Sequence, residues 1–150
     1  MAGKYFEEFA VGQTFVHEIR RTVTDADNIL FSALTYNPAA IHIDHEYAKT
    51  TEFGKPLINS IFTLGLIVGL SVQDTTLGTT LANLGWEEIA FPRPVFAGDT
   101  IRCETKVLAL RDSKSRPGQG IVTFEHTGFN QRGEVIATCR RVALMLRKPS

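Results

Sequence analysis

Residues 57–73 read LINSIFTLGLIVGLSVQ and form the segment around which the rest of the sequence can be organised. No charged side chain lies between Lys55 and Asp74, and the large apolar residues of the segment point to every side of a helical wheel. A helix that is apolar on all sides is normally buried, so we expect a central helix that other elements wrap. The run is shorter than the roughly 20 residues that span a bilayer, and polar residues interrupt it, which disfavours a membrane segment.

The start and the spacing of small residues add detail to this helix. Asn59 or Ser60 can cap its N-terminus, because a side-chain oxygen there accepts from a free first-turn amide. Gly65 and Gly69 lie four residues apart and share a face. Each lowers helix propensity by about 1 kcal/mol relative to alanine, so we expect the sheet or a partner subunit to approach this face closely.

The bulk properties indicate one globular domain over residues 1–150, with 43% apolar residues and a formal net charge of zero. A neutral chain gives no reason to expect nucleic acid or an anionic membrane as partner. Cys103 and Cys139 match no zinc or redox spacing, so we expect buried free thiols in a reducing, cytoplasmic compartment. The acidic N-terminal residues do not resemble a signal peptide.

The segment ahead of the central helix predicts a strand over 13–23 and a helix that begins at Thr24, with carboxylates in its first turn. Its buried face is expected to consist of its apolar residues, namely Ile29, Leu30, Phe31, Ala33 and Leu34. Asn37-Pro38 ends this helix, because proline disfavours the α conformation of the residue before it. Residues 37–44 are then expected to be irregular.

The second half of the chain is strand-like. Asp44 can cap one further short helix over 45–51, after which the central helix follows. Four strands are then predicted, over 81–89, 101–110, 121–129 and 134–147. Helices followed by a run of strands favour an α+β fold with one antiparallel sheet, here curled around one apolar helix.

His42 is the main candidate for chemistry. His17 and His126 fall in strand-like segments, His45 falls on a helix surface, and the Arg140-Arg141 pair is expected to be exposed. His42 instead sits among small and apolar residues, where an imidazole with a pKa near ~6.5 can act as a general acid or base. Asn37 could orient water or the imidazole, and Asp44 could fix the tautomer or cap the next helix; a purely structural His42 remains open.

Three segments together resemble the MaoC-like, (R)-specific enoyl-CoA hydratases. They are ALTYNPAAIHID (33–44), FGKPLINS (53–60) and FPRPVFAGD (91–99), and they occur in the family's order along nearly the whole chain. The resemblance implies the hot-dog fold, a curved antiparallel sheet around one long helix, usually as a homodimer or higher homo-oligomer. It also implies syn addition of water to an acyl-CoA double bond, with no metal or redox cofactor, since CoA is part of the substrate.

The resemblance assigns roles to individual residues. His42 matches the family histidine, while Ser60 stands where the family has a glycine whose backbone amide holds the thioester oxygen. Asn59 replaces the histidine before that glycine. Asn37 stands at the family's aspartate in an ungapped alignment, and a gapped alignment places Thr35 there, so neither supplies a carboxylate. We therefore expect His42 to transfer the proton, Asn37 to position water, and the Ser60 amide to stabilise the enolate.

The pattern is most similar to the subgroup that hydrates mesaconyl-CoA and itaconyl-CoA, which carry a second carboxylate. Arg93 is the cation expected to bind that carboxylate, and Asn59 and Asp44 are the other expected substrate contacts. Two alternatives remain open. A hot-dog thioesterase would need a carboxylate to activate water, and a non-catalytic acyl-CoA-binding protein would account for Asn37 as a lost aspartate.

Overall fold

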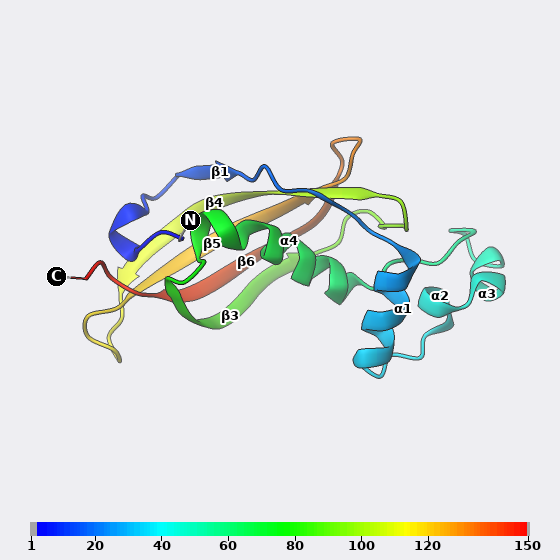
Figure 1. The fold of residues 1–150 in the computed structure, drawn as a ribbon, viewed down its shortest axis with the longest axis horizontal. Helices are drawn as coiled ribbons and strands as arrows, with labels where there is room; N and C mark the ends of the chain where they lie inside the picture. The colour runs from blue at the N-terminus through cyan, green and yellow to red at the C-terminus, as the bar shows by residue number, and fades with distance from the viewer. Residues whose placement is uncertain (1–2, 150) are drawn as a thin grey trace.

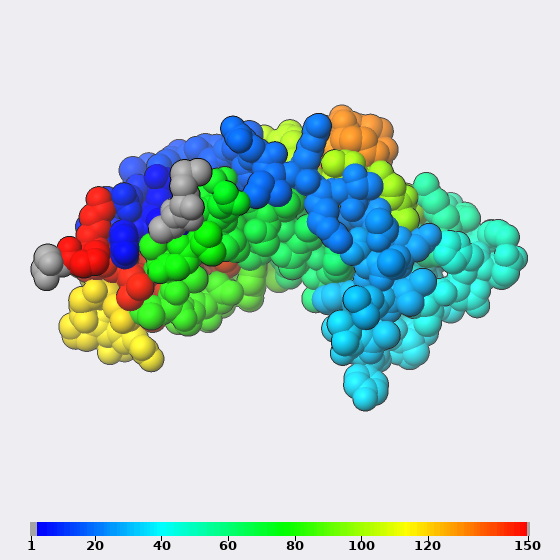
Figure 2. Space-filling model, in the orientation of Figure 1, coloured from blue at the N-terminus to red at the C-terminus, as the bar shows by residue number. Residues whose placement is uncertain are grey.

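The computed structural model describes residues 3–149 and confirms the α+β, hot-dog architecture. Before the central helix lie η1 (Phe6–Glu8), β1 (Thr14–Val16), β2 (Arg21–Thr22), α1 (Asp25–Leu34), α2 (Ala40–Ile43) and α3 (His45–Lys49). The central helix and the long strands are α4 (Ser60–Thr75), β3 (Thr80–Ala90), β4 (Thr100–Asp112), β5 (Gly120–Phe129) and β6 (Val135–Met145). The strands curve around α4, while α1 to α3 project beyond one end of the sheet (Figures 1 and 2).

The sheet is antiparallel, with strand order β1-β4-β5-β6-β3, and β2 also pairs with β4. Its inner face follows the predicted alternation along β4, where the buried residues are Ile101, Cys103, Thr105 and Val107. Alternation with period two places every second residue on the same face. The burial of these four residues of β4 was therefore predictable from the sequence.

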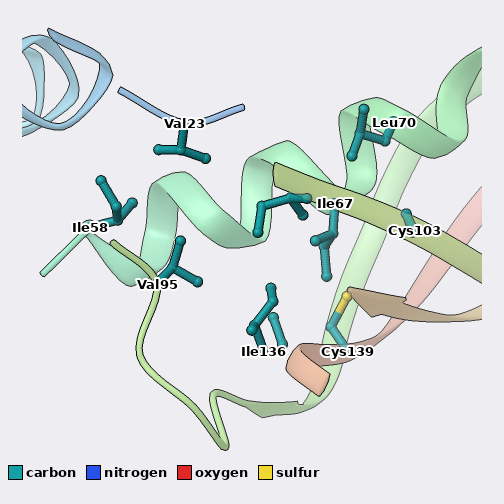
Figure 3. Packing of buried hydrophobic residues seen from close by; sticks show 10 residues of the cluster. Val23, Ile58, Ile67, Leu70, Val95, Cys103, Ile136 and Cys139 are labelled. Carbon is teal, nitrogen blue, oxygen red and sulfur yellow. The ribbon is translucent and has the colours of Figure 1, made fainter. Parts of the chain in front are cut away.

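The core lies between α4 and the inner face of the sheet. Ile67 and Leu70 of α4 lie against Cys103, Ile136 and Cys139 of the strands (Figure 3). Gly128 of β5 permits this contact, because a Cβ at that position would lie 2.5 Å from Ile67 Cγ2. Burial raises the pKa of Cys103 to about 12 and that of Cys139 to about 11, so these two free thiols stay protonated.

The opposite face of α4 is open, and the prediction that this helix is buried on all sides is therefore wrong for the single chain. Ile61 is 56% exposed, and Gly65 and Gly69 are exposed as well. Apart from the adjacent residues and the helix's own backbone, no atom of the described residues lies within 4 Å of a Cβ built at either glycine. The sheet of the same chain consequently does not use the glycine face.

The predicted buried face of α1 is also wrong. Leu30 and Leu34 are 61% and 72% exposed, whereas the buried residues of the helix are Asn28 and Ser32. The side of α1 that faces the chain meets backbone amides and carbonyls, which need polar partners when they are buried. Hydrogen bonding, rather than apolar burial, therefore decides which face of α1 turns inward.

Smaller differences concern the N-terminal half. The strand predicted over 13–23 is two short strands, and His42 lies in helix α2 rather than in an irregular segment. Arg141 is buried, contrary to the expected exposure, because it faces inward on β6 and lies over the Phe124 ring. The Asp44 cap of α3 and the Asn59 cap of α4 are confirmed. Within residues 3–149, no helix is both long and apolar enough to cross a membrane.

Candidate active site

The tautomer of His42 is set by a backbone carbonyl. Leu57 N–H donates to the Ile41 carbonyl at 3.0 Å, which joins α2 to the segment that leads into α4. In return, His42 Nδ1 lies 2.8 Å from the Leu57 carbonyl oxygen. A carbonyl oxygen only accepts hydrogen bonds, so Nδ1 carries the proton, and in the neutral imidazole Nε2 carries the lone pair.

His42 Nε2 is available for chemistry. Among residues 3–149 it has no hydrogen-bond partner, and the side chain is half-buried. An unprotonated ring nitrogen at a partly buried position is a suitable general base near neutral pH.

The start of α4 supplies a free donor. Asn59 Oδ1 accepts from Ile61 N–H at 3.0 Å and so caps the helix. The N–H of Ser60 has no acceptor within the described part of the chain. Because a helix N-terminus carries about half a positive charge, this N–H is suited to binding an oxygen that becomes negative.

A groove of ≈ 270 Å³ opens at this helix end. It contains Ser60 and Arg93 together, and its remaining lining is largely apolar: Phe53, Leu57, Ile58, Thr63, Phe91, Pro92, Pro94, Val95 and Ile136. Leu57 connects the groove to His42, since its carbonyl oxygen accepts the Nδ1 proton. The structure thus brings Ser60 and Arg93 into one groove, whereas His42 is not among the residues that line it and is connected to it through Leu57.

Arg93 is only loosely paired. Its Nε lies 3.7 Å from Glu134 Oε1, and its side chain is about half exposed. Glu134 has closer partners, Asn130 at 2.7 Å and Arg132 at 2.8 Å. The hydrogen bonds from Asn130 and then Arg132 lower the pKa of Glu134. The Arg93 guanidinium is therefore free to turn toward an anion in the groove.

Asn37 makes no hydrogen bond with His42 in the described part of the chain. Its Oδ1 accepts from Ala39 N–H at 3.1 Å, which stabilises the turn before α2. It lines a second, apolar groove of ≈ 350 Å³, whose other residues are Ile29, Ser32, Ala33, Tyr36, Pro38 and Ile43. The alternative residue, Thr35, bonds the Phe31 carbonyl through its hydroxyl at 2.8 Å. Water positioning by Asn37 stays a prediction.

Asp44 and Asn59 both have structural hydrogen bonds. Asp44 is exposed and accepts from Tyr47 N–H at 2.9 Å, as a cap of α3. Asn59 is 4% exposed, and besides its capping bond its Nδ2 lies 3.5 Å from Ser32 Oγ. Contact of either residue with substrate also stays a prediction.

Sequence reasoning missed Asn28. This residue of α1 is buried and hydrogen-bonds the backbone of His42, Leu57 and Asn59. The only signal in the sequence was the carboxamide of Asn28 within a predicted helix, next to the apolar residues Ile29 and Leu30. That signal gives no partner, because the three backbone groups come from other segments of the chain.

Residues 7–130 match the profile of the family described as MaoC like domain. This chain belongs to the MaoC-like dehydratase family. The MaoC-like chain is 33% identical to the mesaconyl-CoA hydratase of Cereibacter sphaeroides over 147 residues, which cover 98% of this chain and 42% of that protein. It is 32% identical to the (R)-specific enoyl-CoA hydratase of Aeromonas caviae, with 75% of this chain and 79% of that protein covered.

The same likeness extends to solved structures. The MaoC-like dehydratase from Rhodospirillum rubrum matches with a TM-score of 0.85 and 32% identity over 99% of this chain and 100% of that chain. Length differs among the relatives: the chain spans 42% of the mesaconyl-CoA hydratase and 38% of the β-methylmalyl-CoA dehydratase of Chloroflexus aurantiacus.

Proposed function

We propose that this chain catalyses the reversible hydration of α,β-unsaturated acyl-CoA thioesters. The observation that carries the proposal is the hydrogen bond from His42 Nδ1 to the Leu57 carbonyl, which leaves Nε2 of the neutral ring unprotonated. The free N–H of Ser60 lies three residues after Leu57 in the chain. Hydratases of enoyl-CoA and mesaconyl-CoA among the relatives point to the same reaction class.

In the proposed reaction, His42 Nε2 accepts a proton from water as the water oxygen bonds to the β carbon. The double-bond electrons move onto the thioester oxygen, and the Ser60 N–H at the positive end of α4 stabilises this enolate. His42 then returns the proton to the α carbon on the same face, which completes syn addition. Loss of one such oxyanion donor typically costs about 3 kcal/mol of barrier, so the amide is as important as the base.

Asn37 is proposed to hold the attacking water through Nδ2, because its Oδ1 is already engaged by Ala39 N–H. A carboxamide has no basic site at neutral pH, which leaves proton transfer to His42. An unchanged kcat in Asn37→Ala would return Asn37 to a role in the turn alone.

The substrate is proposed to be a short branched dicarboxylic enoyl-CoA of the mesaconyl-CoA or itaconyl-CoA type. Arg93 supports this choice, because it shares the Ser60 groove and its nearest carboxylate oxygen lies 3.7 Å away. Arg93→Ala should lower kcat/KM for mesaconyl-CoA by about 10–100-fold, the value of a charged hydrogen bond, and leave crotonyl-CoA little changed.

The matched control for that measurement is Arg111→Ala, which removes an exposed arginine at the far end of β4. It should leave both substrates unchanged. Equal losses for mesaconyl-CoA and crotonyl-CoA in Arg93→Ala would contradict the carboxylate role.

The chain is also proposed to act as a homodimer or higher homo-oligomer in the cytoplasm. β3 pairs only with β6 within the described residues, and it carries exposed Leu84, Trp86 and Ile89. An apolar edge strand of this kind is a template for pairing with another chain. Within the described residues, no other element of the chain covers the glycine face of α4. The two protonated free thiols fit a reducing compartment.

One incubation series tests the proposed reaction. The protein is mixed with crotonyl-, mesaconyl-, itaconyl- and longer linear enoyl-CoA, while loss of conjugated-thioester absorbance and release of free thiol are followed together. Hydration predicts loss of absorbance with no free thiol. Thiol release would instead identify a thioesterase, and binding without change in absorbance would identify an acyl-CoA-binding protein.

A further inference from the structure

We infer that Asn28 is the positioning residue of this site and holds His42 and the start of α4 in one fixed arrangement. Its catalytic consequence rests on the proposed function, whereas the positioning itself rests on the hydrogen bonds of one side chain. Asn28 belongs to α1, which contributes neither the proposed base nor the proposed oxyanion donor.

Within residues 3–149, every hydrogen bond of the Asn28 side chain ends on the backbone of the site. Nδ2 donates to the His42 carbonyl at 2.8 Å and to the Leu57 carbonyl at 2.8 Å. Oδ1 accepts from Asn59 N–H at 2.8 Å. The residue is 1% exposed, so solvent water does not replace these bonds when the side chain is changed.

These bonds act on both halves of the proposed machinery. The Leu57 carbonyl accepts from Asn28 Nδ2 and from His42 Nδ1, which uses both of its lone pairs. The bond to the His42 carbonyl holds the backbone of the same histidine. On the other side, the bond to Asn59 N–H fixes the residue directly before the free Ser60 amide.

One carboxamide therefore sets the distance between the proposed base and the proposed oxyanion donor. Catalytic groups that must meet a substrate on two sides are sensitive to such placement, and a shift of about 1 Å can lower the rate by about 100-fold. Within residues 3–149, the hydroxyl of the neighbouring buried Ser32 has only the 3.5 Å contact with Asn59 Nδ2. The same hydrogen bonds explain why the polar side of α1 faces inward, because the buried backbone groups that Asn28 bonds need a polar partner.

Two substitutions and one control separate positioning from general support of the fold. Asn28→Asp retains the acceptor for Asn59 N–H and removes both amide donors, while Asn28→Leu removes all three bonds at similar volume. Thr75→Val is the control, because Thr75 is fully buried and bonds Ser71 through its hydroxyl at 2.6 Å. Thr75 lies at the opposite end of α4 from Ser60, about 20 Å away along the helix at a rise of 1.5 Å per residue.

The measurements are kcat and KM for mesaconyl-CoA and crotonyl-CoA, the unfolding temperature, and the ¹⁵N shifts of the His42 ring. We expect kcat per folded molecule to fall about 100-fold in both Asn28 variants, with KM within about threefold. The wild-type ring should show a protonated Nδ1, and Asn28→Leu should show a mixture of tautomers. Thr75→Val should lower the unfolding temperature and leave kcat and the ring shifts unchanged.

The inference is overturned if the Asn28 variants lose stability as Thr75→Val does while kcat and the His42 shifts stay at wild-type values. If Asn28→Leu does not fold, Asn28→Asp decides in the same way. If the wild-type protein hydrates no enoyl-CoA, the proposed function fails, and the His42 shifts alone decide: an altered tautomer supports positioning by Asn28, and an unaltered one refutes it.

Discussion

At the scale of single residues, the ring of His42, the proposed base, is oriented by the backbone rather than by a carboxylate. The Leu57 carbonyl fixes the protonated nitrogen, and no side-chain carboxylate bonds the ring among residues 3–149. A carbonyl orients the imidazole without adding a negative charge beside it. This arrangement fits a chain that has Asn37 and Thr35, not an aspartate, at the positions before the histidine.

His126 provides a pH-dependent prediction at the same scale. Burial, and then the charge of nearby Arg141, lowers the pKa of His126 well below its usual value. In the unfolded chain the same group takes a proton below about pH 6.5, so the unfolded state binds more protons as the pH falls. The free energy of unfolding should therefore drop by about 1.4 kcal/mol per pH unit below about 6.5.

Urea unfolding between pH 7.5 and about 5, above the usual carboxylate range, measures this slope at a fixed protein concentration. His126→Asn should remove the dependence of the unfolding free energy on pH, because the carboxamide does not titrate. The carboxamide still offers a hydrogen-bonding partner to the Thr105 hydroxyl, which lies 2.8 Å from His126 Nδ1. His45→Gln, on the exposed surface of α3, should retain the pH dependence. An equal slope in His126→Asn and wild type would show that another group is responsible.

The residue scale also shows what the sequence alone could predict about the site. His42, Ser60 and Arg93 were predicted from short segments around them, and Ser60 and Arg93 do share a groove. Asn28 could not be predicted, because its three partners come from two other segments of the chain, at residue 42 and at residues 57–59. The burial of Arg141 was missed for a similar reason: its exposure depends on which face of β6 the helix covers.

At the scale of elements, α4 combines a structural role with a proposed chemical one. Its buried side packs on the sheet, while its first turn exposes one free N–H. Ser60 is the first residue of the helix, and proline is well tolerated at that position because its missing N–H is not needed for the helix. Ser60→Pro should thus retain the fold and lower kcat by about 100–1,000-fold, the effect of removing one oxyanion donor.

Ser60→Gly is the control for this prediction, because it keeps the N–H and removes only the side chain. It should retain most of the wild-type kcat. Wild-type turnover in Ser60→Pro, with circular dichroism unchanged, would exclude the amide from the reaction.

The elements differ in how well the sequence predicted them. β3 to β6 were predicted correctly. Buried and exposed residues alternate along most of β4 and β5, as a sheet covered on one face requires, whereas β3 has no buried residue. The helix α1 was placed correctly but turned the wrong way, since Leu30 and Leu34 face outward and Asn28 faces inward. The short helix α2 was missed because four residues carry no periodic signal.

At the scale of the whole molecule, the exposed apolar surfaces of β3, α4 and α1 lie on a chain of neutral net charge. Large exposed apolar surfaces mark interaction sites on soluble proteins. We therefore predict a solution mass of at least twice 16.6 kDa by light scattering. Leu84→Lys, at a β3 position that is 51% exposed, should shift this mass to that of a monomer.

Val11→Lys is the matched control, because Val11 is 65% exposed near the N-terminus and away from β3. It should leave the mass unchanged. A wild-type protein that is already monomeric at micromolar concentration would contradict the oligomer.

The central claim is that a single imidazole, His42, moves the proton during hydration of an enoyl-CoA. The most direct measurement compares wild type, His42→Ala and His45→Ala on mesaconyl-CoA, following loss of conjugated-thioester absorbance. We predict turnover by wild type and His45→Ala, and a loss of at least about 100-fold in His42→Ala. Turnover in His42→Ala equal to that of wild type would contradict the account.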